Sequence, residues 1–150
     1  LIHGQIVHAW IEFSKADTLL VADDTVINDR MQQVMLKLAA PKTIKLELLG
    51  IKDAAEYIKT HDESIFLILR NPKTMLDLLN EGVELKEINL GNISMTKSET
   101  GRKTLLKNIH VEKNDVDCLK AIAKKGVTIY IKLVPDDKPI DAIELIEKNY

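Results

Sequence analysis

The chain is predicted to adopt an α/β fold in which helices cover both faces of an open, mostly parallel sheet. Short, nearly all-apolar runs of strand length alternate with amphipathic helical segments. Prolines, glycines and other cap residues separate these segments. No linker, internal repeat or low-complexity stretch divides the 150 residues, so positions 1–150 are expected to form a single domain.

The elements of the first third follow from periodicity. Residues 4–15 place apolar side chains close to a 3.6-residue period, which predicts a helix. Residues 18–22 are nearly all apolar, as is typical of a parallel strand covered on both faces. A second helix is expected to run to about Ala40, where Pro41 bars its continuation. Residues 44–49 predict a further strand.

The middle of the chain continues the alternation. Residues 52–60 predict a helix, and residues 65–69, the most apolar run, predict a central strand. A helix over 72–80 begins with proline in its first turn, and Gly82 lies past its end.

The last third is less regular at its start. Residues 87–91 predict a short strand, and residues 92–112 predict a loop or hairpin excursion. An amphipathic helix over 115–125 is closed by Gly126. The alternating run 127–133 predicts a strand near an edge, and Pro139 is expected to open the last helix.

Composition excludes several classes of function. A formal net charge of -2 gives no electrostatic case for nucleic acid. The lone Cys118 excludes an internal disulfide and fits a reducing compartment. No apolar run approaches the length of a bilayer span, so direct membrane insertion is not expected. The fingerprints of dinucleotide, ATP and zinc sites are missing from the sequence, so we expect no cofactor and no metal.

His3 is the candidate nucleophile because it falls at or just before a helix N-terminus. The free N–H groups and positive dipole end there form an anion site and favour a neutral, nucleophilic imidazole. Gly4 has no Cβ and would let an anion approach the backbone. The N–H groups of Gly4, Gln5 and Ile6 are expected to hold phosphoryl oxygens.

Polar residues follow the predicted strands, and parallel strands would bring them to one edge of the sheet. These supporting candidates are Asp23, Asp24, Arg70, Asn71, Gly91, Asn92 and Lys138. Arg70 or Lys138 could balance phosphate charge, and a carboxylate could orient the imidazole. Four of them also have a structural alternative. Asp23 and Asp24 could cap the following helix, Arg70 could form an ion pair, and Lys138 could belong to a solvated turn over 136–138.

The opening Leu1-Ile2-His3-Gly4-Gln5 resembles the phosphorylation-site motif of IIB components in the mannose/sorbose family of the sugar phosphotransferase system. Five further stretches resemble that family's landmarks, in its order: Val21-Ala22-Asp23-Asp24, Lys37-Leu38-Ala39-Ala40-Pro41, Arg70-Asn71-Pro72, Asn89-Leu90-Gly91-Asn92 and Val134-Pro135-Asp136-Asp137-Lys138-Pro139. Family members have a first strand before the motif, with an acidic pair and an arginine. This strand is expected to be missing before Leu1.

The resemblance implies a histidine phosphocarrier, a protein-histidine-phosphate:sugar phosphotransferase. His3 would accept a phosphoryl group from the phosphorylated IIA component. It would pass the group to a sugar held by the membrane components IIC and IID during uptake. The protein would then be cytoplasmic and held at the inner face of the membrane through IIC and IID. A homo-oligomer is compatible with the sequence.

Two other functions stay open at this point. A non-catalytic regulator of the same fold would bind a sugar or phosphate without forming a phosphohistidine. A phosphatase or transferase would use Asp23 as nucleophile or metal ligand, and its turnover would need a divalent ion.

Overall fold

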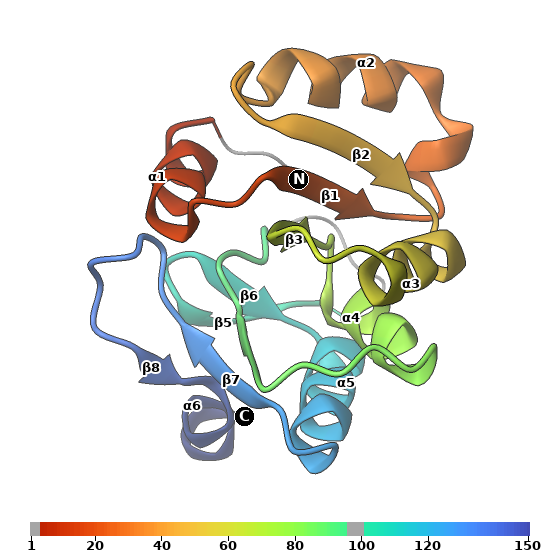
Figure 1. The fold of residues 1–150 in the computed structure, drawn as a ribbon. Coiled ribbons are helices and arrows are strands. Elements are labelled where there is room, and N and C mark those ends of the chain that lie inside the picture. The colour runs from red at the N-terminus through yellow and green to blue at the C-terminus, as the bar shows by residue number, and fades with distance from the viewer. Residues whose placement is uncertain (1–3, 96–100) are drawn as a thin grey trace. The chain divides into compact units, whose positions relative to one another are not determined.

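The computed structural model describes residues 4–95 and 101–150, which form two compact units (Figure 1). The first unit contains Leu1–Arg70 and Asp77–Val83, and the second contains Asn71–Leu76 and Glu84–Tyr150. Helices and strands alternate in both, so the predicted α/β class is confirmed. No helix of the described ranges has both the length and the apolarity to cross a membrane.

The first unit is built on sheet A, a three-stranded parallel sheet. Its elements are α1 (Gly4–Ser14), β1 (Thr18–Ala22), the 3-10 turn η1 (Val26–Asn28), α2 (Arg30–Ala39), β2 (Lys45–Leu49), α3 (Ile51–Thr60) and β3 (Ile65–Ile68). The strand order is β2-β1-β3. The central strand is therefore β1, and the prediction that 65–69 is central is wrong for this sheet. All five residues of β1 are buried, whereas those of β3 are only half-buried.

One face of sheet A carries a continuous apolar core. The register places Leu19 beside Leu46 and Phe66. Val7 and Ile11 of α1 pack on this row. Along the same face, α2 contributes Leu36 to a neighbouring apolar cluster. Helix α3 also contacts β1.

The helix predicted to end at about Ala40 is interrupted at Asp29. This residue is extended, with φ -125° and ψ 98°, and separates η1 from α2. Its Oδ1 accepts a hydrogen bond from the N–H of Gln32 at 3.2 Å. Aspartate is a preferred N-cap because its carboxylate satisfies a free N–H of the first turn. The interruption is therefore a new helix start.

The helix α4 (Pro72–Asn80), predicted at these bounds, is divided between the two units. The other elements of the second unit are β4 (Glu87–Asn89), β5 (Lys103–Leu106), β6 (Ile109–Val111), α5 (Lys113–Lys124), β7 (Thr128–Ile131), β8 (Ile140–Asp141) and α6 (Ala142–Asn149). Strands β4 and β7 are parallel, and β7 and β8 are antiparallel.

One prediction for the second unit is corrected, and the others can be compared with the strand order. The strand in 127–133 lies next to the edge strand β8, as the middle strand of the order β4-β7-β8. Pro139 does not open the last helix, because Ile140 and Asp141 pair with β7 and Asp141 then caps α6. The hairpin excursion is confirmed by the antiparallel pair β5–β6, and residues 96–100 lie outside the described ranges.

Candidate functional site

Asp23 follows β1 and is 1% exposed. Its Oδ1 accepts hydrogen bonds from the N–H of Thr25 at 2.8 Å, the hydroxyl of Thr25 at 2.5 Å and the N–H of Val26 at 3.1 Å. Side chains of Asp, Asn, Ser and Thr close turns in this way by bonding the backbone a few residues on. Asp23 therefore has a structural role, but it shapes the turn into η1 and is not the N-cap of the following helix, which is Asp29 for α2.

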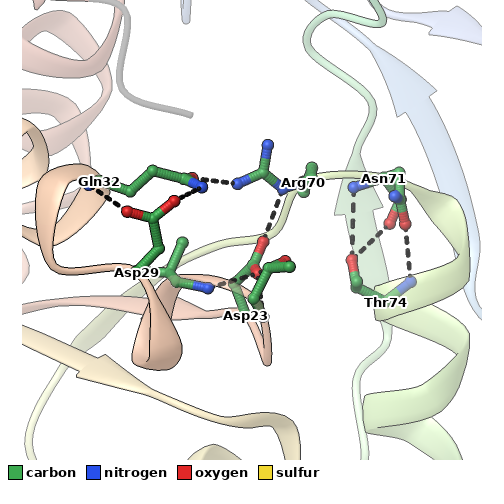
Figure 2. Close-up of polar contacts among 8 residues, drawn as sticks. Asp23, Asp29, Gln32, Arg70, Asn71 and Thr74 are labelled. Atoms are coloured by element: carbon green, nitrogen blue, oxygen red, sulfur yellow. Dashed lines mark hydrogen bonds and ion pairs between the residues drawn. The ribbon is translucent and has the colours of Figure 1, made fainter.

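Arg70 follows β3, the parallel neighbour of β1. Its Nε donates to Asp23 Oδ2 at 2.8 Å, which forms an ion pair (Figure 2). The pairing of Val21 with Ile68 brings the ends of the two strands together, so this contact follows from the parallel register. The side chain of Asp23 is 2% exposed and that of Arg70 is 41% exposed. The pair thus anchors a guanidinium that remains open to solvent.

Asp23 is held as a carboxylate. Burial raises its pKa, but the hydrogen bonds from Thr25, Arg70 and Val26 together outweigh burial, and the pKa lies below the ordinary value. Both oxygens already accept hydrogen bonds. A buried carboxylate engaged on both oxygens is poorly placed to attack a substrate, so the geometry argues against Asp23 as a nucleophile.

Gln32, in the first turn of α2, is a contact that the sequence analysis missed. Its Oε1 accepts from Arg70 Nη2 at 2.8 Å, and its Nε2 donates to Asp29 Oδ2 at 2.8 Å. Arg70 is thereby held through two of its nitrogens, and Figure 2 shows the third directed away from both acceptors. The available signal was Asp29 three residues earlier, because an aspartate N-cap predicts that a helix begins there with residue 32 in its first turn.

Asp24 anchors a different helix from the one expected. Its Oδ1 accepts from the N–H of Ile51 at 2.8 Å, at the start of α3. A Cβ on Gly50 would lie 2.9 Å from the same oxygen, so any other residue there would displace the Asp24 carboxylate or the backbone. Asp24 is exposed, and its hydrogen bond with Ile51 is a structural contact.

The helix start expected to bind an anion is present. Gly4 is the first residue of α1, and Ile6 lies in the first turn. The first N–H groups of a helix, here those of Gly4, Gln5 and Ile6, have no acceptor within the helix, which is the general basis of anion binding at such a terminus. A Cβ on Gly4 would meet nothing within 4 Å, so crowding does not require glycine here. His3 lies outside the described residues.

The other supporting candidates belong to the second unit. Asn71 caps α4, because its Oδ1 accepts from the N–H of Thr74 at 3.0 Å (Figure 2). The carbonyl of Gly91 accepts from Asn108 Nδ2 at 2.7 Å. Asn92 and Lys138 are exposed. In the 136–138 turn, Asp137 Oδ2 accepts from the N–H groups of Leu133 and Val134, which favours the structural alternative for that aspartate.

The whole chain, residues 1–150, matches the family described as the PTS system sorbose subfamily IIB component, PTS being the phosphotransferase system. The chain belongs to this family. It is therefore a IIB component of a sugar PTS, a phosphotransferase component of sugar transport, and the resemblance seen in the sequence is confirmed.

Individual IIB proteins are similar along nearly their full length. The N-acetylgalactosamine-specific phosphotransferase enzyme IIB component 1 of Escherichia coli is 33% identical, over 92% of this chain and 87% of that protein. The sorbose-specific EIIB component of Klebsiella pneumoniae is 25% identical, over 99% of this chain and 91% of that protein. The crystal structure of the IIBSor domain from Klebsiella pneumoniae superposes with a TM-score of 0.91, at 25% identity, over 100% of this chain and 92% of that chain.

Proposed function

We propose that this IIB component is a histidine phosphocarrier that accepts a phosphoryl group from phosphorylated IIA on His3. It then passes the group to a sugar held by IIC and IID, working on the cytoplasmic side of the membrane. The observation that carries the proposal is the family match over the entire chain, which includes the Leu-Ile-His-Gly-Gln motif.

The first step is a transfer between two imidazoles. The lone pair of neutral His3 attacks phosphorus as the N–P bond of the donor histidine breaks. The departing electron pair stays on the donor ring. Because the attacking and leaving groups are alike, the step depends on in-line positioning and charge compensation rather than on a general acid. In the second step a sugar hydroxyl attacks, an O–P bond replaces the N–P bond, and the hydroxyl proton is released.

Arg70 is the charge-compensating group in this proposal. Asp23 and Gln32 hold its Nε and Nη2, and this leaves N–H groups of an exposed guanidinium for phosphoryl oxygens. Arginine suits this task because its planar fork matches the geometry of phosphate. The N–H groups of Gly4, Gln5 and Ile6 supply further donors. Asp24, Asn71, Gly91, Asn92 and Lys138 remain proposed supporting residues.

Intact-mass measurement after incubation with phosphorylated IIA tests the proposal. The wild type is expected to gain one acid-labile, alkali-stable phosphate. His3→Ala should gain none and should keep its fold. His8→Ala changes an exposed histidine of α1 and is the matched control, so it should gain the phosphate. Sugar or phosphate binding by a wild type that gains no phosphate would instead support a regulator.

A further inference from the structure

The outward face of η1 and α2 exposes a row of large apolar side chains. We call this row the α2 ridge; its members are Ile27 (41% exposed), Met31 (73%), Val34 (49%), Met35 (62%) and Leu38 (73%). The ridge holds five of the ten large apolar residues that are exposed in the described ranges. Exposed apolar residues scattered singly are normal, but a contiguous group marks an interaction site.

The ridge is not the core-facing side of the helix. Leu36, on the opposite side of α2, is 7% exposed and packs in the core of sheet A. A surface helix ordinarily turns charged and polar residues toward water. In α2 the spacing of 31, 34, 35 and 38 gives the outward side a second apolar stripe, so this helix has two faces that favour burial.

One edge of the ridge is basic. Arg30 and Lys37 are seven residues apart, which places them on the same side of the helix, and both are exposed. Lys42 follows, with its Nζ on the carbonyl of Lys37 at 3.0 Å. Asp29 is the one acidic residue between positions 27 and 42, and its carboxylate is occupied by Gln32. The edge is thus positive in a chain whose net charge is -2, and it complements an acidic partner.

The same edge opposes self-association. If two copies paired their ridges in antiparallel fashion, Arg30 of one copy would approach Lys37 of the other. Like charges placed opposite each other suppress a pairing. The charge pattern therefore favours a different protein.

The N-terminal end of the ridge and the candidate site share the first turn of α2. Gln32, which bonds Arg70, is the next residue after Met31. A protein that brings a phosphoryl group to Arg70 therefore reaches the N-terminal end of the ridge. Before transfer the phosphoryl charge is on the donor and is attracted by the basic edge. After transfer it is on this chain, and the attraction falls.

We propose that the α2 ridge is the docking surface for the phosphoryl donor, phosphorylated IIA, through an apolar patch bordered by carboxylates. The proposal rests on the proposed function. It adds that donor affinity is set by side chains that take no part in the phosphoryl transfer itself.

Kinetics test the ridge against matched controls. In the double variant Met31→Gln, Leu38→Gln the KM for phosphorylated IIA should rise about tenfold or more, with kcat nearly unchanged, because loss of apolar contact weakens docking alone. Met95→Gln removes another exposed methionine and should leave KM unchanged. Arg30→Glu with Lys37→Glu should raise KM at low salt more than Lys120→Glu with Lys124→Glu, which changes exposed lysines of α5. An unchanged KM in both ridge variants would overturn the proposal.

Direct binding separates this proposal from the proposed function. With methyl-labelled methionine, titration of IIA should shift the signals of Met31 and Met35 and leave Met95 unshifted. This result is expected even if no phosphate is transferred, so failure of transfer would overturn the phosphocarrier function alone. Shifts confined to other methionines would overturn the ridge. The proposal would also be overturned if raising the concentration of this protein alone produced the shifts, since that would indicate a second copy as the occupant of the ridge. Shifts produced by anionic phosphatidylglycerol vesicles would likewise overturn it and would indicate a lipid surface.

Discussion

The Nε of Arg70 lies 2.8 Å from Oδ2 of Asp23, so a single ion pair joins the carboxyl ends of β3 and β1. The carboxylate is buried and the guanidinium is half-exposed. This asymmetry means that the pair does more than close a turn: the sheet fixes one end of Arg70 and presents the other to solvent. In the proposed function, this solvent-facing end compensates the charge of the phosphoryl group that His3 accepts.

Arg70→Lys should slow phosphoryl acceptance from IIA by about tenfold or more, because a lysine ammonium cannot bond Asp23 and Gln32 while facing phosphate. The measurement is the rate of acceptance at fixed donor concentration. Arg30→Lys, at an exposed arginine of α2, is the control for a lost guanidinium and should keep nearly the full rate. Equal rates for Arg70→Lys and wild type would show that Arg70 does not contact the transferred group.

Gln32→Ala should lower the acceptance rate by several-fold, because Arg70 would lose one of its two anchors. Gln32→Glu should restore only part of the loss, since its carboxylate also accepts from Nη2 but would repel the Asp29 carboxylate, to which Gln32 Nε2 now donates. Gln33→Ala is the neighbour control: Gln33 Nε2 donates to the carbonyl of Val26 and does not bond Arg70. If Gln33→Ala slowed acceptance as much as Gln32→Ala, the slower rate would come from a general disturbance of α2 and not from the lost bond to Arg70.

Asp23→Asn should destabilise the fold by about 1–3 kcal/mol, since the change weakens buried hydrogen bonds and leaves Arg70 without its counter-ion. Urea unfolding measures the free energy. Asp136→Asn, at an exposed position of a loop, should change it little. A value for Asp23→Asn within error of wild type would mean that the ion pair does not hold the strand ends.

Acid should weaken the fold partly through Asp23. Its pKa in the folded state lies below the ordinary value of 3.8, so its contribution is present above that value and is lost as the pH falls through the folded pKa. Urea unfolding between about pH 5 and pH 2.5 should show a steeper loss of stability in wild type than in Asp23→Asn. Parallel curves would show that Asp23 titrates alike in the folded and unfolded states.

Periodicity and caps predicted most elements, because those signals are local. Pro72 marked the start of α4, and the apolar run 18–22 marked β1. Local signals did not predict strand order: the apolar content of 65–69 indicates burial, but the pairing that makes β1 central depends on distant segments. Asp29 carried a readable cap signal, yet the apolar pattern continued across it and concealed the break.

The candidate site was predicted where it depends on strand ends. Asp23 and Arg70 follow neighbouring parallel strands, and they do meet. Gln32 was missed because its contact with Arg70 joins residues 38 positions apart and needs the break at Asp29. For Asp24 the sequence offered a site role or a cap of the following helix, but its partner, the N–H of Ile51, lies 27 residues away. Contacts between side chains of separate elements leave no local pattern in a sequence.

The most direct test of the phosphocarrier account is a chase from the protein to the sugar. The wild type is labelled with radioactive phosphate through IIA, freed of donor, and mixed with membranes that contain IIC and IID, with and without sugar. The account predicts that label leaves His3 when sugar is added and appears in equal amount as sugar phosphate. Label that stays on the protein, or leaves as inorganic phosphate without regard to sugar, would contradict it.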